Sequence, residues 1–241
     1  LSRSTATGYY DHNFLSVNER RTDHLGPAQS DTPVTRERLW RIRAKQVVLA
    51  TGAIERPLVF DGNDTPGVML ASAVSTYIHR YAVAPGRSGA VFTNNDSGYQ
   101  AAIDMASAGM EVRAVVDARA KPGAEVSNAV SDIGIPVYRG HVVPSVQSGL
   151  QGLRRIELAK LSADGEDILS HKGLVDCQIL AVSGGWSPVV HLHSQSGGRP
   201  RYQESQACFI PGAPVQEERS AGACAGSFGL AACLQEGADA G

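Results

Sequence analysis

Apolar and charged residues alternate in some segments of the chain and form continuous apolar runs in others. Residues 39–44 alternate, with Trp40 and Ile42 set between arginines, and this pattern predicts a half-exposed strand. Residues 46–52 form an apolar run that ends at Gly52, which is typical of a strand buried on both faces of a parallel sheet. Together with 26 glycines and an aromatic content of 6%, these strands favour an α/β protein with many tight turns.

The N-terminal residues add a strand and a loop. Residues 13–19 predict a strand, whereas residues 21–35 contain little apolar sequence and two turn sequences, Gly26-Pro27 and Asp31-Thr32-Pro33, which predict a loop. The first ten residues have the pattern of the middle of a strand and turn, and they include no initiator Met. We therefore expect the chain to be a piece of a longer protein.

The middle of the chain has the spacing of a βαβ unit. Residues 71–82 carry apolar side chains at helical spacing. Residues 90–93 predict a strand, 97–109 a helix and 111–116 a second strand, which together make a βαβ unit of about thirty residues. The Asp-Gly pair at 164–165 predicts a hairpin turn. The other elements expected here are a helix at 124–133 and strands at 136–138, 140–146, 152–162, 166–172 and 176–182.

Turn residues gathered between Pro57 and Gly67 interrupt this pattern, and we place a domain crossing there. A second crossing follows the buried strand at 176–182, because that strand ends in two consecutive glycines. The expected organisation is an inserted domain at 61–181 within an outer domain formed by 1–60 and 182–241.

Composition narrows the functional classes. Lysine and arginine number 22 against 24 aspartates and glutamates, and this net charge of −2 provides no electrostatic footprint for nucleic acid or anionic lipid. No stretch approaches the ~18 apolar residues of a membrane span, and the N-terminus lacks the basic-then-apolar run of a signal peptide. We expect a cytoplasmic protein that binds neither nucleic acid nor membrane.

Cysteines and histidines form no metal or redox motif. The four cysteines include no Cys-x-x-Cys pair. His191 and His193 are the one close histidine pair; on a strand both would face one side, but no carboxylate or cysteine stands beside them in the sequence. We therefore expect no metal site.

Five short motifs, in order along the chain, resemble the alpha subunits of heterotetrameric sarcosine oxidases, whose fold is of the pyridine nucleotide–disulfide oxidoreductase type. The resemblance extends from about residue 3 to the end of the chain. The motifs are Gly8-Tyr-Tyr-Asp-His-Asn13, Glu55-Arg-Pro57, Pro66-Gly-Val-Met-Leu-Ala71, Thr93-Asn-Asn-Asp-Ser97 and Gly184-Gly-Trp-Ser-Pro188.

This resemblance implies a Rossmann-like dinucleotide-binding domain inserted in an incomplete second one, as in thioredoxin reductase. It implies that the parent protein is an oxidoreductase that demethylates a secondary amine such as sarcosine, with NAD in the outer domain. FAD and FMN would be held mainly outside this chain, and the other oxidase subunits would be its partners. The chain would carry no catalytic residue of its own, and it could self-associate.

Candidate residues of the inner site surround a changed glycine motif. A dinucleotide loop needs the pattern Gly-x-Gly-x-x-Gly, but the equivalent stretch here is Thr93-x-Asn95-x-x-Gly98, so only the third glycine remains. Residues 94–97 would also serve as an ordinary helix cap, and Asp96 would compete with a phosphate. Asp117 stands where an acid would bind a ribose, but we interpret it as a surface acid that ends a strand. The candidates are Thr93, Asn94, Asn95, Ser97, Gly98 and Asp117.

The resemblance also implies an outer NAD site. Flavin-binding members have Ala-Gly-Asp where this chain has Ala221-Gly-Ala223, so the acid that accepts from the flavin is missing. The part of the outer site retained in this chain would lie on a strand, at the turn after residue 50 and at the start of the last helix. An ordinary turn glycine or helix cap would explain these residues equally well. They are Ala6, Thr7, Thr51, Gly52, Ser220, Ala225 and Ser227.

Two other functional classes remain open from the sequence. One is an NAD(P)H-dependent flavin reductase, which would purify with a yellow flavin. The other is a non-catalytic interaction module with decayed nucleotide sites, which would show neither colour nor nucleotide affinity.

Overall fold

The computed structural model describes residues 1–26 and 33–241, so residues 27–32 of the predicted loop lie outside the described residues. The chain divides into two compact units: an outer unit of Leu1–Ile54 with Ser187–Gly241, and an inner unit of Glu55–Trp186. These bounds lie a few residues from those expected from the sequence. The difference arises because Leu58, Phe60 and Val182 pack into a core of the inner unit.

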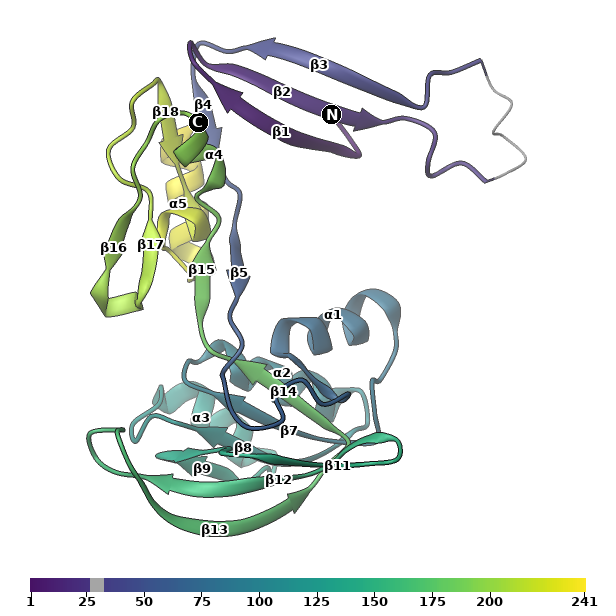
Figure 1. Cartoon of the computed structure of the whole chain (residues 1–241), viewed down its shortest axis with the longest axis vertical. Helices are drawn as coiled ribbons and strands as arrows, with labels where there is room; N and C mark the ends of the chain where they lie inside the picture. Colours follow the sequence, from purple (N-terminus) through teal and green to yellow (C-terminus); the bar gives the residue numbers. More distant parts are fainter. Residues whose placement is uncertain (27–32) are drawn as a thin grey trace. The chain divides into compact units, whose positions relative to one another are not determined.

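A parallel sheet of five strands forms the centre of the inner unit (Figure 1). Its order is β6-β14-β7-β8-β9. The strands are β6 (Val68–Leu70), β7 (Ser88–Thr93), β8 (Glu111–Asp117), β9 (Val137–Arg139) and β14 (Ile179–Ser183), and the helices α1 (Ala71–Tyr81), α2 (Ser97–Ser107) and α3 (Ala124–Asp132) connect them. The predicted βαβ unit is present as β7-α2-β8, and the predicted α/β class is confirmed.

Residues of the central strands alternate between two separate cores. On the helix side, Val91 and Val115 pack with Tyr99 and Met105 of α2. On the other side, neighbouring strand residues such as Phe92 pack against a second sheet. Since both faces are covered, the strands read in the sequence as continuous apolar runs.

The second sheet of the inner unit is antiparallel. It contains β10 (His141–Val142), β11 (Val146–Gly149), β12 (Gly152–Leu161) and β13 (Ile168–Asp176). The turn between β12 and β13 includes Gly165 at a φ of 79°, a conformation that glycine adopts without strain. The Asp-Gly hairpin signal is therefore confirmed, whereas the strand expected at 140–146 is only β10 followed by an irregular segment.

The outer unit begins with a three-stranded antiparallel sheet, β1-β2-β3. Its strands are β1 (Ser4–Tyr10), β2 (Phe14–Arg20) and β3 (Glu37–Arg43). The turn between β1 and β2 places His12 and Asn13 at φ values of 60° and 51°, in the left-handed region that few residues other than glycine adopt.

The rest of the outer unit consists of short elements. β4 (Val47–Leu49) pairs in parallel with β18 (Glu218–Ser220), and β16 (Arg201–Gln203) pairs with β17 (Cys208–Ile210) in a hairpin. The chain passes between the units on β5 (Ala53–Glu55) and β15 (Trp186–Pro188), which pair with each other. The helical segments are α4 (His191–Gln195), the 3-10 turns η2 (Glu204–Gln206) and η3 (Gly222–Ala225), and α5 (Leu230–Ala240).

No helix among residues 1–26 and 33–241 combines the length and the apolar character needed to cross a membrane.

Candidate functional site

The carboxyl ends of β7 and β14 mark the place where a dinucleotide would bind in this kind of fold. From β7 the chain continues through α2 to β8 and then β9, whereas β14 lies on the opposite side of β7. Connections therefore diverge at this point, and in open parallel sheets ligands bind in the crevice outside such a switch point. The candidate residues 93–98 lie here.

Side chains of the loop after β7 form hydrogen bonds with the backbone of the same loop. The backbone N–H of Asn95 donates to Thr93 Oγ1 at 3.1 Å, and the same hydroxyl donates to the carbonyl of Asn95 at 2.9 Å. The loop is therefore folded on the side chain of Thr93, at the position where the motif requires its first glycine.

Asn95 also bridges the two strands that flank the crevice. Its Nδ2 donates to the carbonyl and to the hydroxyl of Ser183, at 3.1 and 3.0 Å, and the backbone N–H of Asn94 donates to the same carbonyl at 3.3 Å. Since Ser183 ends β14, these bonds join the carboxyl ends of β7 and β14 directly. The loop after β7 is thus held to the end of β14 by three hydrogen bonds to Ser183.

The first turn of α2 is capped by Asn95 and not by Asp96. Asn95 Oδ1 accepts from the backbone N–H of Ser97 at 3.1 Å and also contacts the Ser97 hydroxyl. That hydroxyl in turn accepts from the indole N–H of Trp186 at 2.9 Å. Asp96 makes no capping bond; its carboxylate accepts from Arg119 at 2.7 Å and from the backbone of Gly123 at 3.3 Å. The helix cap expected from residues 94–97 is therefore present through Asn95, whereas the Asp96 side chain bonds to Arg119 and Gly123 instead.

Gly98 is required by close packing against the strand that precedes it. A Cβ atom at this position would lie 2.5 Å from Thr93 Oγ1. The one glycine that remains of the motif thus lets α2 approach β7, as the third glycine of a dinucleotide fold does.

Asp117 is not the surface acid that the sequence suggests, since it is completely buried. Its carboxylate accepts from the Tyr99 hydroxyl at 2.9 Å and from the guanidinium of Arg119 at 2.8 and 3.1 Å. Burial, then the charge of Asp117, raises the pKa of Tyr99. Burial alone would lower the pKa of Arg119, but the hydrogen bonds to Asp117 and Asp96 raise it. No part of this carboxylate is left for a ribose.

The outer candidates fall into two groups, and the structure brings the larger one together. Ser220 ends β18, which pairs with β4 just before Thr51 and Gly52. The Thr51 hydroxyl donates to the carbonyl of Val189 at 2.7 Å. From the sequence, Ala225 and Ser227 are expected at the start of the last helix. In the structure Ala225 lies in η3 and Ser227 follows it, so both residues precede that helix.

A carboxylate of α5 occupies the donors of this group. Glu236 accepts from the backbone N–H of Gly222 at 2.7 Å, and its other oxygen contacts the Ser227 hydroxyl. Ala223, where the resemblance implies an acid in flavin-binding members, lies in η3 between Gly222 and Ser227 in the sequence. An oxygen of a bound nucleotide could use these donors only if Glu236 moved away.

Ala6 and Thr7 lie apart from that group in the hydrogen-bonding pattern. Both are on β1, where the Thr7 hydroxyl donates to the carbonyl of Ser16 at 3.1 Å across the β1–β2 pair. In the described part of the chain, the side-chain hydrogen bonds of Thr7 go to Ser16.

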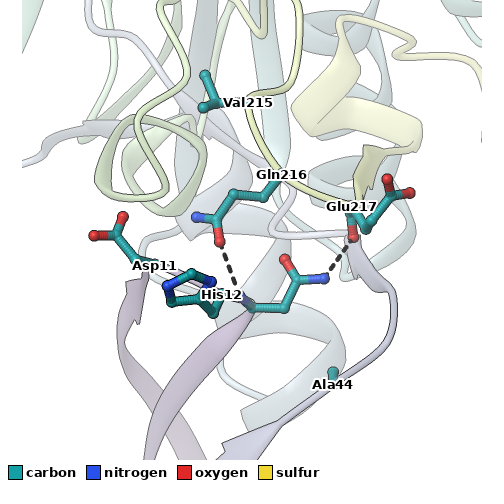
Figure 2. Close-up of a pocket in the computed structure, with 7 residues that line it drawn as sticks. Asp11, His12, Ala44, Val215, Gln216 and Glu217 are labelled. Carbon is teal, nitrogen blue, oxygen red and sulfur yellow. Dashed lines mark hydrogen bonds between the residues drawn. The ribbon is translucent and has the colours of Figure 1, made fainter.

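Asn13 is a buried residue that sequence reasoning missed. It borders a pocket of about 520 Å³, shown in Figure 2, and its backbone N–H donates to Gln216 Oε1 at 2.8 Å. Its side-chain amide donates to the carbonyls of Lys45 and Glu217, both at 3.2 Å, and its Oδ1 accepts from the Tyr9 hydroxyl at 2.7 Å. Asn13 thus ties three segments of the outer unit together.

The histidine pair lies on a helix and not on a strand. His191 begins α4, and His193 is buried with its Nδ1 against Glu218 of β18. The carboxylate that seemed to be missing is thus supplied by a residue 25 positions away. Among the described residues, no group of three or more histidine, cysteine or acidic side chains could hold a metal ion.

Comparison of the whole sequence with known proteins identifies its relatives. No protein-family model matches it. A sarcosine oxidase subunit alpha of Corynebacterium sp. (strain P-1) is 44% identical over 100% of the chain, and one of Rhizobium meliloti (strain 1021) is 41% identical over 99%. The chain is homologous to part of the sarcosine oxidase alpha subunit. The resemblance that the motifs indicate is confirmed, and the chain spans about a quarter of the curated relatives' length, 24% and 22%.

Solved structures agree on the fold. Thioredoxin reductase of T. acidophilum has a TM-score of 0.65 at 16% identity, with 85% of this chain and 66% of that chain covered. L-proline dehydrogenase of P. horikoshii has a TM-score of 0.59 at 20% identity, with 92% and 36% covered. The predicted disulfide oxidoreductase-like fold is therefore confirmed.

Proposed function

We propose that the chain is part of the alpha subunit of a sarcosine oxidase-type enzyme, in which it is a scaffold associated with NAD and holds no catalytic residue. The identity with sarcosine oxidase alpha subunits along the whole chain carries this proposal. The parent enzyme would oxidise sarcosine or a related secondary amine in the cytoplasm, together with its other subunits.

The inner unit does not fit a dinucleotide. The Thr93 and Asn95 side chains take the backbone groups of the loop, Asn95 joins it to Ser183, and Arg119 takes the carboxylate of Asp117. A pyrophosphate would have to displace several of these bonds, each worth about 1 kcal/mol or more. The inner unit would therefore act as a support and not as a second nucleotide site.

The outer unit fits a nucleotide better. Gly222 N–H and Ser227 Oγ are two donors on one turn beside the end of β18, and a ribose or phosphate oxygen can accept from such groups. The alanine at position 223 removes an acceptor for flavin, which favours NAD there and supports FAD and FMN sites elsewhere in the assembly. Bound NAD would be recognised as a nucleotide here. Thr51, Gly52, Ser220 and Ala225 would lie beside it at the same strand ends.

Mass spectrometry of small molecules released from the purified chain tests this proposal. We expect no released flavin, no flavin absorbance and no disulfide reductase activity, since thiol–disulfide exchange needs a cysteine pair and the sequence has no Cys-x-x-Cys. Stoichiometric FAD would overturn the proposal in favour of a flavin reductase.

A calorimetric titration with NAD defines the outer site more sharply. Glu236→Ala is expected to bind NAD about tenfold or more tightly than the unmodified chain, because it frees two donors. Gln235→Ala, on the same helix, is the matched control and should leave the affinity unchanged. If neither chain nor variant binds NAD, the closed inner crevice favours the second candidate, a non-catalytic interaction module.

A further inference from the structure

His193 and Glu218 form a buried acid–base pair in the wall of a second pocket of the outer unit. The two residues are 1% and 4% exposed, and the pocket has a volume of about 350 Å³. His193 Nδ1 contacts one oxygen of Glu218, and the Ser196 hydroxyl donates to the other at 2.6 Å. Both oxygens of the carboxylate are therefore hydrogen-bonded.

The other ring nitrogen fixes the protonation state of His193. The backbone N–H of Gly212 donates to His193 Nε2 at 3.2 Å. A nitrogen that accepts a hydrogen bond carries no proton, so the proton is on Nδ1, where it is donated to Glu218. The two ring contacts thus match the Nδ1–H tautomer of His193.

The imidazole ring of His193 is held on two sides. Gly198 packs on the imidazole so closely that a Cβ at position 198 would lie 2.3 Å from the ring carbon Cε1. Glu218 holds the Nδ1 side. Gly212 is itself packed against the backbone of Arg199, since a Cβ at position 212 would lie 2.2 Å from the Arg199 carbonyl oxygen, so the contact at Nε2 is close on both sides.

Gly212 belongs to a short loop that forms part of the pocket wall. Pro211, Gly212 and Pro214 line the pocket, and so do Ser220 and Ala225. A displacement of this loop would therefore alter the pocket beside Ser220 and Ala225.

We propose that His193 is a proton-linked switch: a proton added at Nε2 places two N–H donors opposite each other, expels Gly212 and shifts the loop at residues 211–214. The added proton forms an N–H bond at Nε2, and the ring becomes an imidazolium paired with the Glu218 carboxylate. Solvent supplies the proton on acidification. This inference does not depend on the proposed nucleotide site.

The charged groups around His193 and Glu218 have opposite effects on protonation of the His193 ring. The Glu218 carboxylate favours a proton on the ring, whereas Arg201 of β16 and Arg219 of β18, which line the same pocket, oppose it. From β1, the Tyr9 phenol stays neutral, because burial and then the charge of Glu218 raise its pKa to about 12.

NMR of the 15N-labelled chain from pH 8 to pH 5 tests the switch. We expect the ring nitrogens of His193 to report the Nδ1–H tautomer at pH 8 and imidazolium at pH 5. The hydrogen-exchange protection factor of the Gly212 amide should fall by about tenfold or more with the same midpoint. Titration of His193 with unchanged Gly212 protection overturns the proposal, and so does a ring that stays neutral down to pH 5.

A pair of variants separates the switch from a general effect of acid. His193→Gln keeps an acceptor near Gly212 but does not titrate in this range, so the pH dependence of Gly212 protection should disappear. His191→Gln, on the exposed side of the same helix, should keep it. If the first variant does not fold, the comparison of ring and amide midpoints in the unmodified chain still decides.

Discussion

Asn13 shows how much of the outer unit depends on a single side chain. It is 5% exposed, lies in the left-handed region and links residues 45 and 217 through its amide. Asparagine tolerates this backbone conformation better than most residues, and its amide supplies both donors and an acceptor. The residue thus satisfies a backbone requirement and a hydrogen-bonding requirement together.

Asn13→Ala is expected to destabilise the outer unit by about 2–4 kcal/mol, because the change strains the backbone and leaves buried partners without hydrogen bonds. Urea unfolding followed by tryptophan fluorescence would measure the loss, since Trp40 lies in this unit. The control is His12→Gly, which changes an exposed neighbour with the same backbone conformation and should remain within about 1 kcal/mol of the unmodified chain. Equal effects of the two variants would contradict the role assigned to the Asn13 amide.

Asp117→Ala is expected to destabilise the inner unit by about 2–4 kcal/mol. The variant leaves the buried Tyr99 hydroxyl without its acceptor and removes one of the two carboxylates that hold Arg119. Loss of amide protection in β8, measured by hydrogen exchange, would locate the effect. Asp132→Ala, an exposed acid at the end of α3, should change stability by less than about 0.5 kcal/mol.

Single residues were also where sequence reasoning failed. Asp117 and His193 look ordinary in the sequence because their partners, Tyr99, Arg119 and Glu218, are distant along the chain. Gly98, in contrast, could be interpreted correctly, since its spacing from Thr93 already describes the strand–turn–helix contact that excludes a side chain. The spacing of residues in the sequence therefore predicts local contacts, but it does not predict partners that are distant along the chain.

At the scale of elements, α1 and α2 are joined by a buried carboxylate. Asp104 of α2 accepts from Gln100 at 2.9 Å and from His79 of α1 at 3.1 Å. Burial alone would raise the pKa of Asp104, but hydrogen bonds from Ser75, Gln100 and His79 outweigh it and lower the pKa. The charged carboxylate thus stabilises the packing of the two helices.

This shift predicts a pH dependence of known sign. A carboxyl whose folded pKa is depressed contributes stability above its unfolded pKa, about 3.9, and loses it as pH falls through the folded value. The difference in unfolding free energy between the unmodified chain and Asp104→Asn should therefore be constant above about pH 5 and shrink below pH 4. A difference that grows on acidification would contradict the assignment.

The length of an element decided whether it could be predicted. The long elements α2, β8 and β12 repeat their apolar pattern often enough to be recognised. β16, β17 and β18 have three residues each, too few for any period to show, and their pairing comes from contacts distant in sequence. Among the outer candidates, Ser220 ends β18, and Thr51 and Gly52 follow the equally short β4, so these residues could be placed only by resemblance.

For the molecule as a whole, chemical-shift mapping with NADH separates the two units. If the inner crevice is closed, NADH at micromolar concentration should shift no amide between residues 93 and 98 or at Asp117. Any shifts should lie near Gly222 and Ser227 of the outer unit. Saturable shifts at the loop after β7 would show that the bonds from Asn95 to Ser183 open readily.

Exposed apolar side chains predict that the chain self-associates. Leu230 and Leu234 lie one helical turn apart on α5 and are 76% and 66% exposed. Sedimentation velocity should show concentration-dependent association, which Leu230→Lys with Leu234→Lys reduces. Gln235→Lys adds charge at a polar position and should not reduce it. A monodisperse monomer at high concentration would contradict this prediction.

The segments that enter and leave the inner unit are paired through backbone hydrogen bonds. Arg56 N–H donates to the carbonyl of Gly185 at 2.8 Å, and Gly184 N–H donates to the carbonyl of Arg56 at 2.7 Å. The inner unit therefore begins and ends at one point, like a cassette whose two ends meet. Such a cassette could be excised and closed into a ring by a short linker. The same geometry would let a gene gain or lose the inner unit in one piece, because its adjacent ends require little change in the rest of the chain.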